Sequence, residues 1–237
     1  MVIDVVLYSG ERELLDARVD ILKADRTIVV EGDKSFTGKP KKIETLPKNL
    51  DHLKLEVGQD PDPWVNEKKL RQDSFDYLKT LDLPDDTIVG FFDVDEIPDP
   101  ELLRGTTILS AWKMSKYQMS LFWYQHKELT GLSGSWANIK NEDIPSLRWK
   151  REFLPCVEGG YHLSSFMTLE LLIEKWQHIS HQELVRPNME EWLRHCWYNG
   201  IAVENENPLT EQEPEGIPKR LLELPSVFMR KREKIAK

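Results

Sequence analysis

One run of residues organises this sequence: Thr87-Ile88-Val89-Gly90-Phe91-Phe92-Asp93-Val94-Asp95-Glu96-Ile97-Pro98. Its first half is apolar, β-branched and aromatic over the length of a strand, and it ends in three acids before a proline. Such a run predicts a buried strand, and ligands of open α/β sheets gather at the carboxyl ends of the strands. Side chains repeat every second residue along a strand, so Asp93 and Asp95 should point the same way. Two carboxylates at that spacing can share a hard divalent cation.

The acidic run also has a structural interpretation, in which it caps the next helix with Asp99 as N-cap and Pro100 in the first turn. Asp99 is sufficient for that cap, so Asp93, Asp95 and Glu96 are left over. A cation held between these acids and a diphosphate would screen the charge of a nucleotide leaving group. We therefore favour a functional site over a simple cap.

Composition narrows the class of protein. With 237 residues, 40% of them hydrophobic, and no low-complexity linker, the chain is expected to form one α/β domain over residues 1–237. The net charge of −9 disfavours nucleic acid as a partner, because gripping its backbone needs a basic face. No hydrophobic run has the length of a membrane span. Two scattered cysteines, Cys156 and Cys196, make neither a disulfide framework nor a zinc site and fit the cytoplasm.

The N-terminal segments predict a parallel strand–helix–strand unit. Val2–Tyr8 is expected to be a buried strand, Glu11–Leu22 a helix and Thr27–Val30 a second strand. Glu31 would then lie at the same sheet edge as Asp93, where a nucleotide would sit. The alternative for Glu31 is an acid that is simply solvated.

Two further segments lead to the acidic run. Residues 33–62 are polar and are expected to cross the surface as a long loop. Asn66–Leu81 has helical spacing and carries Arg71. Arg71 is either a surface salt-bridge partner or a contact to the donor diphosphate, which suits guanidinium geometry.

The second half mixes strand, loop and helix signals. Lys113–Tyr124 alternates as a half-buried strand does, and residues 131–146 are expected to be a loop. Trp123, Tyr124 and Trp136 could form a platform for a sugar ring, or could equally be core.

Histidines and a basic tail complete the candidates. His162, His178 and His181 lie around one predicted helix with Leu169 and Ile179 on its apolar face. A histidine near a helix C-terminus is often a dipole partner, and a metal-ligand role for His181 is the second hypothesis. The basic residues 230–234 could make a weak peripheral contact with an anionic membrane, or be a solvated helix end.

Taken in order, these segments resemble glycosyltransferase family 17, whose known members include the β-1,4-mannosyl-glycoprotein 4-β-N-acetylglucosaminyltransferase. The resemblance covers nearly the whole chain. It is carried by Gly10-Glu11 with Leu14-Leu15 and Arg18, Val29-Val30-Glu31, Phe36-Thr37-Gly38-Lys39-Pro40-Lys41, Trp64 with Arg71, Asp93-Val94-Asp95-Glu96-Ile97-Pro98, Phe122-Trp123, and Gly160-Tyr161-His162-Leu163-Ser164 with Lys175.

The resemblance implies a single GT-A-type, Rossmann-like domain with a mostly parallel central sheet flanked by helices. Residues 1–110 would form the nucleotide-sugar-binding half, and residues 111–237 the acceptor-side half with the C-terminal helices. It also implies a UDP-sugar donor, UDP-GlcNAc first, a divalent metal (Mn²⁺ or Mg²⁺), and inversion at the anomeric carbon. The sequence has Tyr161 where animal members commonly have Trp, and it lacks their membrane anchor, which favours a cytoplasmic enzyme.

The implied site follows residue by residue. Metal ligation falls to Asp93, Asp95 and His181, and the catalytic base that takes the acceptor proton is Glu96 or Glu183. The donor contacts would be Ser9, Gly10, Glu11, Glu31, Arg71, Asp93 and His162.

The expected acceptor is a saccharide, neutral or cationic, stacked on Trp123, Trp136 or Tyr161. Two alternatives stay open: a glycosyltransferase that modifies hydroxylated bases of viral DNA, and a non-catalytic protein that binds nucleotide sugars. A phosphatase with Asp-x-Asp would carry the motif on its first strand, and a calcium loop would need a central glycine, so neither fits this sequence.

Overall fold

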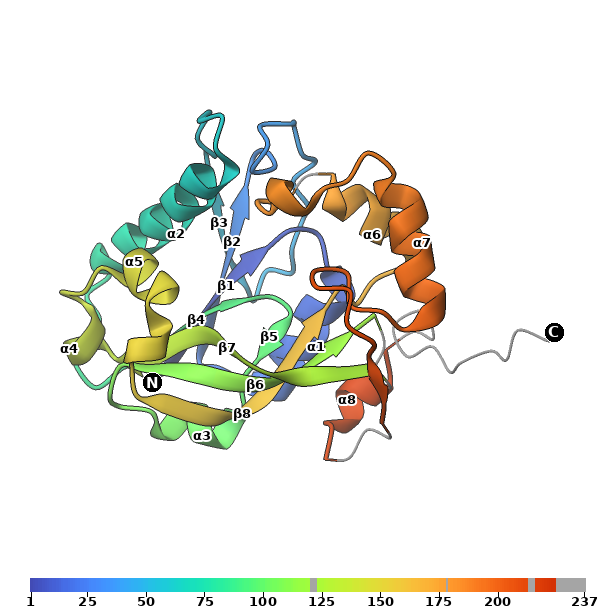
Figure 1. The fold of residues 1–237 in the computed structure, drawn as a ribbon. Helices are drawn as coiled ribbons and strands as arrows, with labels where there is room; N and C mark the ends of the chain where they lie inside the picture. The colour runs from blue at the N-terminus through green and yellow to red at the C-terminus, as the bar shows by residue number, and fades with distance from the viewer. Residues whose placement is uncertain (120–122, 178, 213–215, 225–237) are drawn as a thin grey trace.

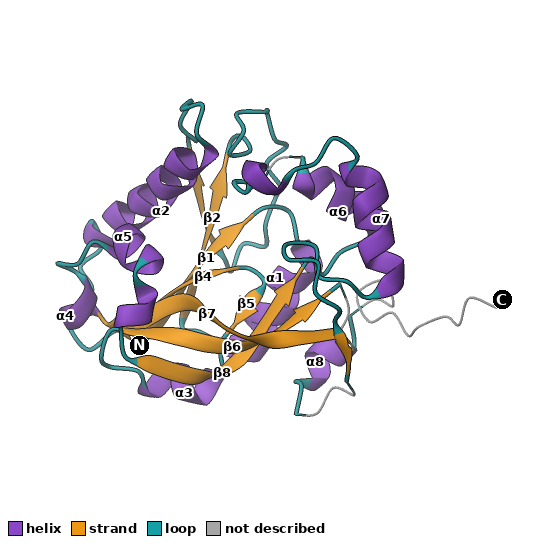
Figure 2. Ribbon diagram, viewed as in Figure 1, coloured by secondary structure: helices purple, strands orange, loops and turns teal. Residues whose placement is uncertain are grey.

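The computed structural model describes residues 1–119, 123–177, 179–212 and 216–224, which form a mixed sheet with helices on both faces (Figures 1 and 2). The strands of this part of the chain are β1 (Val2–Tyr8), β2 (Arg26–Gly32), β3 (Asp51–Leu55), β4 (Ile88–Asp93), β5 (Glu96–Ile97), β6 (Ser110–Gln118), β7 (Trp123–Ser135), β8 (Cys156–Ser164) and β9 (Thr210–Glu211). The helices are α1 (Arg12–Leu22), α2 (Pro63–Lys79), α3 (Pro100–Gly105), α4 (Trp136–Ile139), α5 (Ile144–Trp149), α6 (Leu169–Trp176), α7 (Met189–Asn199) and α8 (Lys219–Leu222), with 3₁₀ turns η1 (Arg151–Phe153) and η2 (Gln182–Leu184).

The strand order confirms the predicted fold class. Across the sheet the strands run β3-β2-β1-β4-β7-β6-β8-β5, and β9 pairs with β7. The first four are parallel, in the order of one half of a Rossmann fold, and the predicted β1–α1–β2 unit is among them. Strand β7 pairs antiparallel with both β4 and β6, whereas β6 and β8 are parallel to each other. The chain is thus an α/β protein with a central, mostly parallel sheet flanked by helices.

Alternation along β1 divides the core between the two faces. Val6 and Tyr8 pack into the cluster that contains the buried residues of α1, α6 and α7. Ile3 and Val5 face the other way, into the cluster formed with α2 and α4. Because both faces are covered, the strand is apolar throughout except for Asp4, which is buried and paired.

Two predicted loops contain regular structure. Residues 33–62 include β3, an edge strand that pairs in parallel with β2 and is polar because its exposed side needs no apolar residues. Residues 131–146 include the end of β7, all of α4 and the start of α5. The single strand predicted over 113–124 is two strands, β6 and β7, of which β6 ends at Gln118.

Strand register brings the predicted acids to one sheet edge. Tyr8 is opposite Glu31 between β1 and β2, and Leu7 is opposite Asp93 between β1 and β4. The expectation that Glu31 and Asp93 share an edge is therefore confirmed. Among the described helices, none combines the length and the apolar character needed to cross a bilayer. The basic tail at 230–234, His178 and Phe122 lie outside the described residues.

Candidate active site

The acidic run forms a turn between β4 and β5, which is held by a hydrogen bond within the turn and by a buried arginine of α1. Glu96 Oε2 accepts a hydrogen bond from the backbone N–H of Asp93 at 2.9 Å. Arg18, fully buried on α1, donates to both carboxylate oxygens of Asp4 at 2.6 and 2.7 Å and to the carbonyl oxygens of Asp93 and Glu96. One buried guanidinium thus ties α1, β1 and the acidic turn together.

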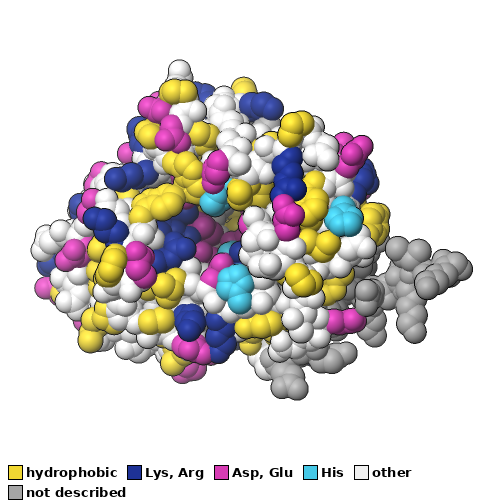
Figure 3. All heavy atoms as spheres, viewed as in Figure 1, with side chains coloured by type: hydrophobic (Ala, Val, Ile, Leu, Met, Phe, Trp, Pro, Cys, Tyr) yellow, Lys and Arg dark blue, Asp and Glu magenta, His cyan; other side chains and the backbone are white. Residues whose placement is uncertain are grey.

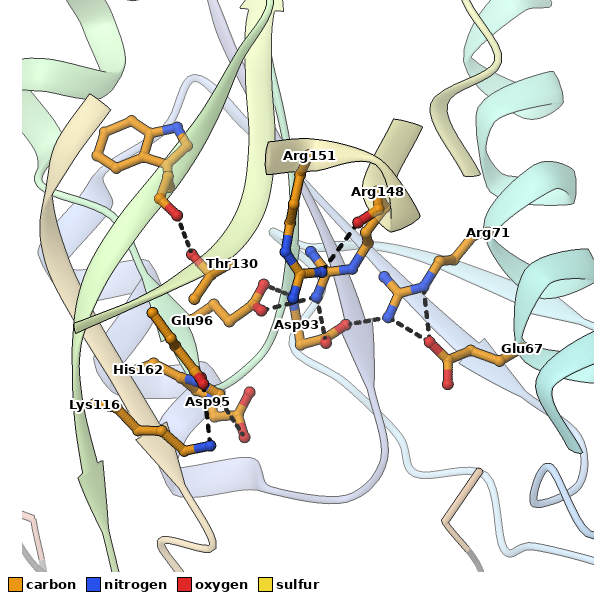
Figure 4. A network of polar contacts seen from close by, with 12 residues as sticks. Glu67, Arg71, Asp93, Asp95, Glu96, Lys116, Thr130, Arg148, Arg151 and His162 are labelled. Carbon is orange, nitrogen blue, oxygen red and sulfur yellow. Dashed lines mark hydrogen bonds and ion pairs between the residues drawn. The ribbon is translucent and has the colours of Figure 1, made fainter. Parts of the chain in front are cut away.

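Two arginines from different helices form ion pairs with the Asp93 carboxylate (Figure 4). Arg71 of α2 donates to Oδ1 at 2.8 Å, and Arg148 of α5 donates to Oδ2 at 2.7 Å. Arg148 also donates to Glu96 Oε1 at 2.8 Å. Burial alone would raise the pKa of Asp93, but the two guanidinium groups outweigh it and hold that pKa well below its usual range.

The surroundings of the Asp95 carboxylate differ from those of Asp93. Its carboxylate lies 3.8 Å from His162 Nε2 and 3.9 Å from Lys175 Nζ, and no described residue donates a hydrogen bond to it. Burial raises its pKa against the opposing effect of these two cations. Lys175 of α6 is shared with Glu11, whose Oε1 accepts from it at 2.9 Å. Asp95 is therefore a buried acid that this part of the chain only partly compensates.

A second group of charges lies beside Asp95 on β6, β7 and β8. His162 is hydrogen-bonded through Nδ1 to Glu128, and Lys116 Nζ is 3.2 Å from the other Glu128 oxygen. Burial would raise the pKa of Glu128, but His162 and Lys116 lower it to about 2. Burial would lower the pKa of His162, but Glu128 and Asp95 raise it. Figure 4 shows Lys116 and His162 beside Asp95.

The N-terminal candidates line the same edge. The backbone N–H of Ser9 donates to Glu11 Oε2 at 3.2 Å, and Gly10 supplies the positive φ of +110° that this turn needs. Glu31 is fully buried between Lys41 at 3.0 Å and His52 at 2.9 Å. Each of these residues sits where the sequence suggested, and their roles as donor contacts stay predictions.

His181 directly precedes η2 and Glu183 lies on it, and both are close to Trp64 of α2. The two are hydrogen-bonded at 2.8 Å, both are about half exposed, and the His181 ring packs edge-on against Trp64. No contact joins His181 to Asp93 or Asp95, and the described residues contain no set of three His, Cys, Asp or Glu side chains arranged to hold a metal ion. The ligand role of His181 stays a prediction without a supporting contact.

Three of the candidate residues have other contacts in the structure. Glu96 is buried with both oxygens occupied, by Arg148 and by a backbone N–H, so it is placed to shape the turn and not to accept a proton. Trp136 cannot be a sugar platform, because it is 5% exposed and packs against Phe75 in the core. Tyr161 is committed to Gly216, whose carbonyl oxygen accepts from its hydroxyl at 2.7 Å.

The sequence reasoning missed Arg148, Glu128 and Lys116. Lys116 and Glu128 come close through the pairing of β6, β7 and β8, and Arg148 comes from helix α5. One local signal was available for Arg148: the run Leu147-Arg148-Trp149-Lys150-Arg151, in which three basic residues surround a tryptophan.

Together these side chains suit an anionic ligand that is bound to a metal cation. Acids and bases gather in a hollow in the middle of the face seen in Figure 3. Arg71, Arg148 and Lys175 can face phosphate oxygens, and guanidinium groups bind such oxygens in pairs. Asp95 can accept a hard divalent cation. A diphosphate bound with a metal ion satisfies both requirements.

Comparison with known proteins agrees with this chemistry. No curated protein matches the chain. Among solved structures, the crystal structure of Rv0371c from Mycobacterium tuberculosis H37Rv is similar at a TM-score of 0.37 and 13% identity, over 69% of this chain and 88% of that one, a likeness too low to support an argument. The model of glycosyltransferase family 17, by contrast, matches residues 1–194. The chain therefore belongs to glycosyltransferase family 17 and is a glycosyltransferase.

Proposed function

We propose that this enzyme transfers a sugar, GlcNAc in the first instance, from a UDP-linked donor to a saccharide acceptor, with a divalent cation and with inversion to a β-linkage. Membership in the family supports the transfer of a sugar from a nucleotide donor. The observation that carries the metal-dependent form is Asp95, a buried carboxylate at the end of β4 with no hydrogen-bond donor among the described residues.

The donor set fits a divalent ion such as Mn²⁺ or Mg²⁺ at Asp95. Such ions are often held by one or two carboxylates, with waters and substrate phosphates completing the coordination. Both oxygens of Asp93 are paired with guanidinium groups, so Asp93 would reach the ion through a water or would instead bind the donor ribose. When bound, the ion would neutralise charge on the diphosphate as it leaves.

The arginines would hold the phosphates. Arg148 has a buried Nη1 for which the described residues provide no acceptor, although its Nη2 serves both Asp93 and Glu96. A buried donor without a partner is costly, and a phosphate oxygen would satisfy it. Arg71 and Lys175 add positive charge on the other sides of the acids. Fixed charges of this kind, placed before the reaction, usually make the largest catalytic contribution.

Inversion needs a base for the acceptor hydroxyl. Of the two carboxylates considered, only Glu183 is open to an acceptor, since its side chain is 55% exposed and that of Glu96 is 5% exposed. We therefore assign the base to Glu183. The hydrogen bond from the neighbouring His181 would help to orient this carboxylate.

Thermal unfolding with UDP, in the presence of Mn²⁺ or EDTA, tests the donor site. UDP should stabilise the protein only with Mn²⁺, by about 2.7 kcal/mol at a hundredfold excess over the dissociation constant. Asp95→Asn should abolish this effect, whereas Asp85→Asn, the same change at a side chain that is 68% exposed, should leave it intact.

The outcome also discriminates among functions. Equal stabilisation by UDP in EDTA would refute the metal-dependent form. Binding without UDP release from UDP-GlcNAc, with saccharide acceptors present, would point to a sugar-nucleotide-binding protein. An α-configured product, seen in the anomeric proton signal, would contradict inversion.

A further inference from the structure

A groove that the donor chemistry does not use lies between α2 and α5. It has a volume of about 370 Å³ and is lined by Trp64, Val65, Lys68, Ser146, Trp149 and Lys150. This volume is within the range of small-molecule sites, which are mostly apolar with a few polar groups. Trp149 is 51% exposed and Val65 is 47% exposed, so the apolar lining is open to solvent.

The aromatic part of the groove is preorganised. Trp64 and Trp149 meet edge to face with ring centroids 4.8 Å apart, and His181 packs edge-on against Trp64 at 4.4 Å. An indole held in this way loses little freedom on binding and offers a flat apolar face. The C–H face of a sugar ring is the complementary surface. The groove therefore offers the exposed aromatic surface that Trp136, buried in the core, does not.

The rim of the groove is basic. Lys68 and Lys150 are exposed, and within the described chain neither forms an ion pair. Asp143 lies near both lysines, and its pKa is lowered first by its hydrogen bond from Ser146 and further by these lysines. The charged residues that line the groove are the two lysines, so its lining is positive although the whole chain carries −9.

The groove and the candidate active site share the same two helices, α2 and α5. Trp64, Glu67, Lys68 and Arg71 fall on one face of α2, at the spacing of helical neighbours. Glu67 accepts from Arg71 at 2.9 Å and from Ser180 at 2.5 Å, and Arg71 reaches Asp93.

Helix α5, the other wall of the groove, also carries a residue of the candidate active site. Arg148, which binds Asp93, directly precedes Trp149 on α5. A ligand in the groove thus lies against the same two helices that deliver both arginines to the donor side.

We propose that this groove is the acceptor subsite and that it binds an acidic saccharide, a sugar chain bearing a carboxylate or phosphate, by stacking on Trp149 and Trp64 with its charge toward Lys68 and Lys150. The proposal rests on the proposed function and names the class of its acceptor. It replaces the neutral or cationic sugar expected from the net charge, because charge complementarity within binding distance is decided by the nearby groups.

Saccharide binding without donor tests the groove independently of catalysis. A hyaluronan tetrasaccharide, which carries glucuronate, and chitotetraose, which is neutral, are titrated by tryptophan fluorescence and calorimetry. The acidic probe should bind the wild type more tightly and lose that advantage at high salt. Trp149→Ala should weaken its binding about tenfold, the effect of one lost aromatic contact. Lys68→Gln with Lys150→Gln should remove the preference for the acidic probe.

The controls separate the groove from the donor site and from folding. Tyr198→Ala removes an aromatic ring that is 47% exposed on α7, outside the groove, and should not change saccharide binding. UDP-dependent stabilisation in Mn²⁺ should be unchanged in all the groove variants. Because the two lysines are exposed, their double variant is expected to fold even if Trp149→Ala does not.

Three results would overturn the proposal: no binding of the acidic probe, binding that ignores both Trp149 and the lysines, or equal binding of chitotetraose at low salt. Failure of UDP to stabilise the wild type would instead count against the donor site. In that case the saccharide titration, which uses no donor, still tests by itself whether the groove binds an acidic saccharide.

Discussion

Single carboxylates in this site have separate tasks, although the sequence shows only a row of acids. Asp93 is paired with two arginines, Asp95 is buried with no hydrogen-bond donor among the described residues, and Glu96 holds the turn through the Asp93 N–H. The difference comes from the groups around each acid, because burial and nearby charge set what a carboxylate can do.

Replacing the two candidate bases separates catalysis from stability. Glu183→Gln should lower kcat by about 10²–10⁴ with little change in the melting temperature, as expected for loss of a general base. Glu96→Gln should lower the free energy of unfolding by about 1–3 kcal/mol, because Arg148 loses a charged partner. Steady-state kinetics and urea unfolding of both variants check this. A Glu183→Gln enzyme with normal kcat would remove Glu183 from the mechanism.

Acid should weaken the contacts of Glu128. The folded pKa of Glu128, about 2, lies below its ordinary value of 4.5, so its stabilising effect is complete above pH 4.5 and is lost as pH falls toward 2. At 1.36 kcal/mol per pKa unit, this effect is on the order of 3 kcal/mol. Urea unfolding should show the deficit of Glu128→Gln shrinking over that range. A deficit that stays constant with pH, as for the exposed control Glu152→Gln, would contradict the assignment.

Among the elements, α1 and the β4–β5 turn depend on one buried ion pair. Arg18→Ala leaves Asp4 unpaired in the core and should cost about 3–5 kcal/mol. The matched control is Arg12→Ala on the same helix, where the pair with Asp16 is more than a third exposed and should contribute about 1 kcal/mol or less. Similar losses in the two variants, measured by urea unfolding, would show that Arg18 does not support the turn.

The pairing of β5 with β8 places Glu96 opposite His162 and depends on Gly160. Gly160 has φ +88°, and a Cβ there would lie 2.4 Å from the carbonyl oxygen of Ile97. Gly160→Ala should therefore lower stability by more than the roughly 1 kcal/mol that positive φ costs alone, and should reduce activity. Gly38→Ala has a similar φ of +81° with no atom within 4 Å, and it isolates the backbone cost. Equal melting temperatures would refute the steric argument.

For the molecule as a whole, the net charge of −9 predicts that nucleic acid is a poor acceptor. At −9, the chain should not retain duplex DNA in a gel shift even at about 50 mM salt. Incubation with labelled UDP-GlcNAc and hydroxylated DNA should likewise leave the DNA unlabelled. Label in the DNA, with none in saccharides, would favour the viral-base alternative over the acceptor proposed here.

Local patterns in the chain were enough to identify three of the four parallel strands, β1, β2 and β4, and the acidic run. The β-branched runs of β1, β2 and β4 bury on both faces, and such strands are apolar regardless of their partners. The acids that end β4 stand out against this apolar run, whereas Asp4, the acid inside β1, needs the buried partner Arg18. The edge strand β3 escaped notice because its exposed side imposes no pattern.

The partners of those acids were decided only by packing. Asp93 and Arg148 are 55 positions apart, and whether they meet depends on how β7 and α5 dock on the sheet. Trp136 and Trp149 show the same limit: both are tryptophans near predicted loops, yet one is 5% exposed in the core and the other is 51% exposed in the groove. A local pattern records the backbone state of a residue, whereas its environment is set by side chains that arrive from distant elements.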